Sequence, residues 1–201
     1  MLALTKNTPS FLNKVYLSES KIREIHTPEK PLAEGDLAPH FTFASQNWLE
    51  NHGLTDISLR DLNQKPLVIV FYSVYWNGHG INLLKKMEKL QDKIGDTAGI
   101  LVVTSEARKK LYKTIGEHHF SLNFYYDEGQ ALAEKFGIFS EDRPTWNLFS
   151  GIETNVPLLS SYVVGTSGQI SFRHIDNFSS PFPEEDLLVA VNGQPEIRLY
   201  K

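Results

Sequence analysis

The sequence contains no cysteine among its 201 residues. Thiolate catalysis, disulfide exchange and thiolate metal sites are therefore excluded for this chain, because each needs a cysteine sulfur as nucleophile or ligand. The absence carries no information about the redox compartment, since a chain without thiols neither forms disulfides nor needs protection from forming them.

Net positive charge and long apolar runs are missing as well. Lys and Arg total 20 against 24 Asp and Glu, and the net charge of -4 lacks the basic footprint of a nucleic-acid-binding protein. The sequence has no run of eighteen apolar residues, so it predicts no membrane-spanning helix. Residues 1–30 lack the charged start, apolar run and cleavage site of a secretory signal. We therefore expect a cytoplasmic protein without nucleic-acid or membrane partners.

The chain is long enough for one sizeable core, with 41% hydrophobic and 22% charged residues. Apolar residues in 11–25 fall partly at helical spacing, and Pro28 then ends any helix. We predict an N-terminal helical extension and linker over residues 1–33, followed by one compact domain over residues 34–201.

Strands and helices alternate along this domain. Residues 67–72 form a continuous β-branched and aromatic run, typical of a central strand covered on both faces. Apolar residues at three- and four-residue steps then predict an amphipathic helix over 81–94, which Gly95 closes. The remaining predicted strands are 41–44, 56–59, 99–104, 122–126, 161–164 and 170–175, and the remaining helices are 106–115, 130–136 and 184–191.

Parallel α/β units followed by a hairpin and a helix resemble the thioredoxin fold, an α/β fold with a central mixed sheet flanked by helices. Residues Gly35–Phe41 have the pattern G-x-x-A-P-x-F. Further on, an aspartate is followed by two alanines and a Phe-Gly-Ile segment, at Asp127, Ala131, Ala133 and Phe136–Ile138. These motifs resemble the opening and the later D-then-A-x-x-F/Y-G-V segment of the peroxiredoxin-like branch of the alkyl hydroperoxide reductase and thiol-specific antioxidant (AhpC/TSA) family. The resemblance covers about Gly35–Val191.

The active-site motif departs from the family pattern. Phe71–Gly80 matches F-Y-x-x-x-W-C-x-x-C except at both cysteines, where Asn77 and Gly80 stand. Val156–Gly165 resembles L-P-x-P-A-x-Y-V-I-D, with Leu159 in place of the cis-proline; a two-residue gap puts Pro157 there instead. The family implies a peroxidase or thiol oxidoreductase, but the thiolate that the helix N-terminus would activate is absent. We expect no activity by that mechanism and no cofactor.

Other chemistry at the motif has weaker support. Asn77 is explained by capping of the following helix, and His79 by a solvated turn. The pair His118–His119, and His174 beside Asp176, lack the spacing of a metal site. Ser160–Ser161 lacks the G-x-S-x-G elbow of a serine nucleophile. No metal site is therefore predicted.

The segment 139–156 is longer than a typical connection and has no clear period. It contains Trp146 and Phe149, so it suits a binding lip beside the active-site turn, an ordinary packed loop or a dimer contact. These alternatives remain open.

Three functions follow from the sequence. The first is a redox-inactive binding module that holds a protein or small ligand on the degenerate active-site face. The second is an enzyme with a cysteine-free mechanism based on His79 or a metal, and the third is a structural role such as homodimer formation. The predicted contact residues of the binding module are Trp76, Asn77, Gly78, His79, Gly80, Pro157 and Leu159.

Overall fold

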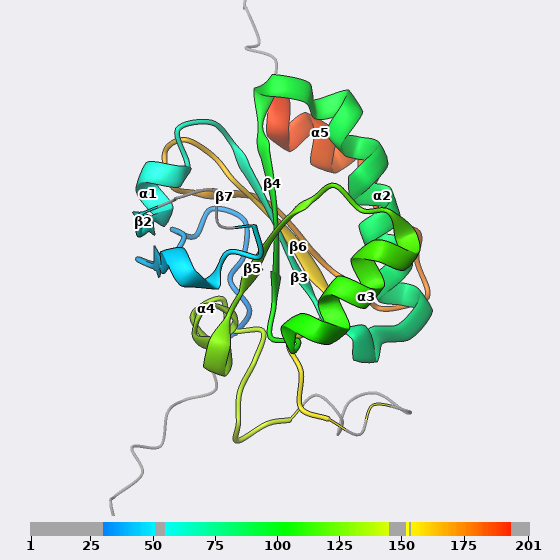
Figure 1. The fold of residues 1–201 in the computed structure, drawn as a ribbon. Helices are drawn as coiled ribbons and strands as arrows, with labels where there is room; N and C mark the ends of the chain where they lie inside the picture. Colours follow the sequence, from blue (N-terminus) through cyan, green and yellow to red (C-terminus); the bar gives the residue numbers. More distant parts are fainter. Residues whose placement is uncertain (1–29, 51–54, 145–151, 153, 194–201) are drawn as a thin grey trace, which may run out of the picture.

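The computed structural model describes residues 30–50, 55–144, 152 and 154–193. A five-stranded sheet of order β5-β4-β3-β6-β7 forms the centre of the molecule (Figure 1). Its strands are β3 (Leu67–Tyr72), β4 (Gly99–Thr104), β5 (Asn123–Tyr126), β6 (Ser160–Val164) and β7 (Ile170–Ile175). The helices are α1 (Leu59–Leu62), α2 (Asn77–Ile94), α3 (Arg108–His118), α4 (Ala131–Lys135) and α5 (Glu184–Asn192), and a small hairpin pairs β1 (Thr42–Phe43) with β2 (Ile57–Ser58).

Strand β3 is buried along its whole length because both faces of the sheet are covered. Val68, Val70 and Tyr72 share a core with α2, α3 and α5. The alternate side chains of β3 share the other core with α4 and the β1–β2 hairpin. Figure 1 shows these helices on the two sides of the sheet. This explains the uninterrupted apolar run of β3, since period-two alternation is not needed in a strand with two buried faces.

The parallel strands β3, β4 and β5 end at one edge of the sheet, where Tyr72 pairs with Thr104 and Thr104 with Tyr126. Strand β6 runs antiparallel to β3 and starts at this same edge, because Ser160 pairs with Phe71. The loops after β3, β4 and β5 therefore meet the segment before β6. In open α/β sheets, ligands bind outside the carboxyl ends of the parallel strands.

The thioredoxin-like α/β fold with a central mixed sheet, predicted from the sequence, is confirmed. The prediction for 56–59 is wrong at its end, because the strand stops at Ser58 and helix α1 begins at Leu59. The Ser58 hydroxyl accepts a hydrogen bond from the Asp61 amide at 3.1 Å, so Ser58 caps this short helix. In the parts of the chain that the structure describes, no helix has the length and apolar character needed to cross a membrane.

The predicted N-terminal helix, 11–25, lies outside the described residues. Residues 30–38 run along the domain surface. The Leu32 amide donates to the Phe136 carbonyl at 3.0 Å, and the Ala38 amide donates to the Gly168 carbonyl at 2.8 Å. The described part of this segment is thus tied to the ends of α4 and of the β6–β7 hairpin. The proposed boundary between extension and domain stays a prediction.

Candidate binding site

The turn between β3 and α2 is held by a buried carboxylate. Ser73 ends the extended backbone of β3, and residues Val74–Trp76 form a single 3-10 turn. Glu106, which follows β4, accepts hydrogen bonds on Oε1 from the Ser73 hydroxyl at 2.6 Å and from the Val74 amide at 3.2 Å. Glu106 thus fixes the Ser73 side chain and the Val74 backbone within the stretch that resembles the family's active-site motif.

Trp76 lies inside the molecule and joins two predicted site segments. Its side chain is 3% exposed, and its indole N–H donates to the Pro157 carbonyl at 2.9 Å. The indole ring lies 5.3 Å from the ring of Phe178. Pro157 and Leu159 are buried too. These residues support the turn from beneath, while Asn77, Gly78 and His79 form its exposed surface.

Asn77 begins α2 with φ 48° and ψ -131°, a backbone conformation that L-residues rarely adopt. The capping position of the helix is Trp76, whose side chain makes no capping hydrogen bond. The prediction that Asn77 caps this helix is therefore wrong. The tight turn out of the 3-10 segment forces the φ of Asn77 to be positive, and the helix begins directly after it.

Gly80 faces the sheet and has no space for a side chain. A Cβ atom built at Gly80 would lie 2.8 Å from Cε2 of Tyr72 and 3.2 Å from the Ser73 carbonyl oxygen. Tyr72 is 1% exposed, so its ring cannot swing into solvent. Burial raises the pKa of Tyr72 to about 12, with a smaller upward contribution from the Glu106 charge, against the lowering effect of its hydrogen bond to Thr114. The position of the second family cysteine is thus filled by a neutral phenol.

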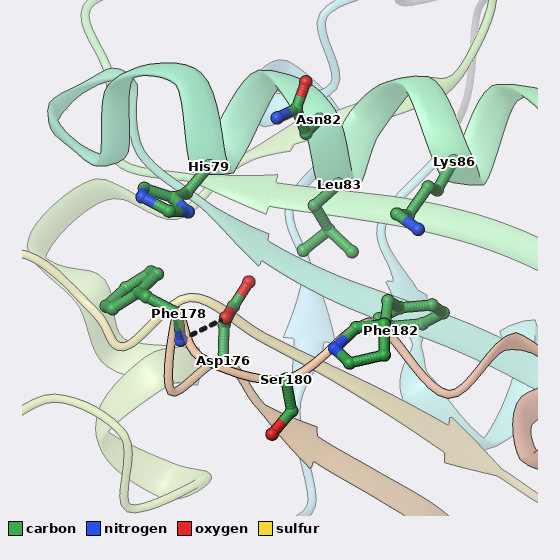
Figure 2. Close-up of a pocket in the computed structure, with 9 residues that line it drawn as sticks. His79, Asn82, Leu83, Lys86, Asp176, Phe178, Ser180 and Phe182 are labelled. Atoms are coloured by element: carbon green, nitrogen blue, oxygen red, sulfur yellow. Dashed lines mark hydrogen bonds between the residues drawn. The ribbon is translucent and has the colours of Figure 1, made fainter.

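A pocket of about 140 Å³ opens beside the exposed part of the turn. Figure 2 shows His79 and Leu83 reaching from α2 toward the loop that follows β7, where Phe178 lies opposite His79. The two rings are 4.5 Å apart. We call this the His79 pocket; its lining residues are His79, Asn82, Leu83, Lys86, Asp176, Phe178, Ser180, Pro181 and Phe182.

The loop opposite α2 has a defined shape. The Phe178 amide donates to Asp176 Oδ1 at 2.7 Å (Figure 2). The Asp176 amide donates to the Leu159 carbonyl at 2.9 Å. This second bond ties the loop to the segment before β6. Asp176 and Lys86 bring opposite charges to the pocket rim, and His79 and Phe178 bring aromatic rings. A partner side chain with an apolar or aromatic body fits such a lining.

The histidines that the sequence analysis considered outside the motif lie at two separate places in the fold. His118 and His119 lie at the end of α3, a helix that leaves the site edge at Arg108. His174 lies in β7, and burial lowers its pKa while the Asp176 charge raises it. Within the described residues, no group of three His, Asp or Glu side chains that would hold a metal ion occurs. Ser160 and Ser161 are buried in β6, and the Ser160 hydroxyl donates to the Leu158 carbonyl.

Sequence reasoning missed Phe178 and Glu106, and it considered Asp176 only as a neighbour of His174 in a possible metal site. Phe178 and Asp176 follow β7, about a hundred residues after the motif, and no pattern in their neighbourhood indicates a site. Glu106 had a usable signal, since it follows a predicted buried strand at the edge where α/β sheets bind ligands. Residues 145–151 and 153 of the segment 139–156, proposed as a binding lip, lie outside the described residues.

No cis peptide bond occurs within the described residues, so neither Pro157 nor Leu159 follows one. This holds for both alignments of the segment before β6.

Solved structures of known proteins share the fold of this chain. A search of curated protein sequences finds no match. Among solved structures, AhpC from Mycobacterium tuberculosis is 17% identical with a TM-score of 0.59, covering 81% of this chain and 93% of its own. A thiol peroxidase from Chromobacterium violaceum is 14% identical with a TM-score of 0.61, covering 81% and 88%. The reduced 2-Cys peroxiredoxin of Plasmodium vivax is 13% identical with a TM-score of 0.60, covering 81% of each chain.

At these identities the structural likeness establishes the fold. Membership of a family rests on the sequence itself, because residues 35–173 match the model of the AhpC/TSA family. That match spans the motif turn, both sheet halves and the segment before β6. The chain therefore belongs to the AhpC/TSA family, without the cysteines on which the thiol chemistry of such a site depends.

Proposed function

We propose that this protein is a redox-inactive member of its family that binds a partner through the outer face of the degenerate active-site turn. One observation carries the proposal: the position of the second cysteine is filled from inside by Tyr72, while Asn77, Gly78 and His79 remain exposed beside a pocket. Because the position at Gly80 is closed while the surface around His79 is accessible, the turn favours binding over catalysis.

The dimensions of the His79 pocket favour a protein partner over a free small molecule. Its volume of about 140 Å³ lies below the roughly 300–1,000 Å³ of pockets that enclose drug-sized ligands. A single side chain of a partner fits this space, with its ring or apolar body between His79 and Phe178. Exposed Asn77 and Gly78 then offer polar contacts around that anchor.

The test is a double variant, H79A/F178A, compared with Y112A. Tyr112 is an aromatic residue on α3, 51% exposed, and lies outside the pocket, so Y112A controls for general loss of surface aromatic area. Partners captured on immobilised protein are quantified by mass spectrometry, and the affinity of each purified partner is then measured by calorimetry.

We expect at least one partner whose affinity falls about tenfold or more in H79A/F178A and is unchanged in Y112A, as removal of a central anchor predicts. Melting curves confirm that both variants are folded. Identical partner sets and affinities for the original protein and both variants would refute the proposal.

A further inference from the structure

A second pocket, of about 360 Å³, opens on the other side of the same turn. It lies over the carboxyl ends of the parallel strands, because Tyr75 follows β3, Glu106 and Lys110 follow β4, and Gln130 follows β5. This edge is the usual ligand position of open α/β sheets. We call it the Glu106 pocket; it shares no lining residue with the His79 pocket.

Glu106 brings a buried negative charge without a counter-ion to this pocket. The residue is 5% exposed, and its hydrogen bonds from Ser73 and Val74 both end on Oε1. Within the described part of the chain, Oε2 accepts no hydrogen bond and no Lys, Arg or His lies at salt-bridge distance from the carboxylate. A buried charge is stable when it is paired or fully hydrogen-bonded, so the free oxygen calls for a cationic donor.

Lys110 brings the opposite charge to the same pocket. Its Nζ lies 3.5 Å from the Tyr75 hydroxyl and 5.1 Å from the centre of the Tyr75 ring, both neutral groups. No carboxylate of the described residues forms a salt bridge with Lys110. Glu106 and Lys110 thus face one pocket without pairing with each other.

Gln130 adds an acceptor that also lacks a donor. Its backbone is left-handed, with φ 61°, and its Oε1 is buried without a hydrogen-bond partner among the described residues. Buried polar atoms are almost always hydrogen-bonded, so an unpaired one in a pocket wall indicates a missing partner. A primary ammonium has three N–H donors and can serve more than one such acceptor.

We propose that the Glu106 pocket binds a small zwitterion of the amino-acid class, with its ammonium group on Glu106 and its carboxylate on Lys110. Such a ligand neutralises both unpaired charges at once, which neither a simple amine nor a simple acid does. The volume of the pocket lies within the range of small-molecule sites. The inference stands on residues other than those of the proposed protein-binding face, so either one can fail alone.

Calorimetry with unbranched amino acids, from glycine to 6-aminohexanoate, tests the proposal on the full chain. The single-charge probes n-pentylamine and pentanoate serve as references. We expect one chain length, the one that matches the spacing of Glu106 and Lys110, to bind about tenfold or more tightly than either reference, as a second charged hydrogen bond predicts.

Two variants assign the ends of the ligand. E106Q keeps an oxygen acceptor for Ser73 and Val74 but removes the charge, so affinity for both the amino acid and n-pentylamine should fall about tenfold. K110M, at an exposed position, should lower the affinity for the amino acid and leave the affinity for n-pentylamine unchanged. E117Q, an exposed carboxylate on α3, is the matched control and should change nothing. If every chain length binds no better than the references, or if E106Q binds the amino acid as tightly as the original protein, the proposal is wrong.

Discussion

Gly78 and Gly80 lie on either side of His79 in the first turn of α2, and their surroundings are opposite. A Cβ atom at Gly78 would meet nothing within 4 Å, whereas at Gly80 it would lie 2.8 Å from the Tyr72 ring. The outer face of this turn is open and the inner face is closed by packing. Tyr72 closes the inner position in this protein, and the outer surface of the turn is accessible.

The largest expected effect separates these two glycines by stability. G80A should lower the free energy of unfolding by about 2 kcal/mol, because overpacking of a rigid core site outweighs the gain in helix propensity. G78A should be neutral or slightly stabilising, since its methyl group enters open space. Urea denaturation of both variants measures the difference.

A second substitution identifies the cause of the G80A effect. Y72L removes the ring edge that the new methyl group meets, so G80A should cost much less in the Y72L background than in the original protein. An equal cost in both backgrounds would show that Tyr72 does not close the position, and the comparison of the two glycines would then lose its explanation.

A smaller effect of opposite sign is expected at Asn77. N77G should stabilise the protein by about 1 kcal/mol, because glycine adopts φ 48° without the steric cost that asparagine carries. The control is N82G, on the exposed face of α2, where glycine brings no backbone relief and should give no gain. Thermal and urea unfolding of the two variants decide this; stabilisation of both to the same extent would contradict the assignment of strain to Asn77.

The smallest effect is a pH dependence under the His79 pocket. Burial lowers the pKa of His174 in the folded protein, opposed by the Asp176 charge, so the unfolded chain binds the proton more readily. The contribution of His174 to stability is therefore complete above its unfolded pKa of about 6.5 and is lost as pH falls from there through the folded pKa. H174Q should flatten the fall in stability below that pH. Unchanged slopes in urea titrations across this range would contradict the assignment.

Secondary structure was predicted correctly from the sequence where burial determines the pattern of apolar residues. Strand β3 was predicted at its observed bounds, because a strand covered on both faces must be apolar throughout. The start of α2 was placed four residues late, at Ile81, because the glycines of the motif interrupt the apolar period there. At Leu59 a local capping bond replaced the expected strand, and side-chain capping competes with strand pairing in such short elements.

The site was harder to predict because its features depend on contacts between distant segments. The two family positions, Asn77 and Gly80, were identified from the resemblance to the family motif, but a motif does not show that Tyr72 fills one of them. Similarly, Trp76 was expected at the binding surface, whereas its bond to Pro157 holds it inside. Aromatic residues in turns contact either solvent or core, and the choice is made by the chain that packs on them.

The central claim is that the inner cysteine position is closed, and the absence of cysteine from the sequence allows a direct measurement. G78C and G80C each introduce a single thiol, whose reaction with Ellman's reagent is followed with increasing urea. The account predicts that the thiol of G78C reacts rapidly in the folded protein, while that of G80C reacts only in proportion to the unfolded fraction. A stable G80C variant whose thiol reacts as fast as that of G78C and consumes peroxide would contradict it.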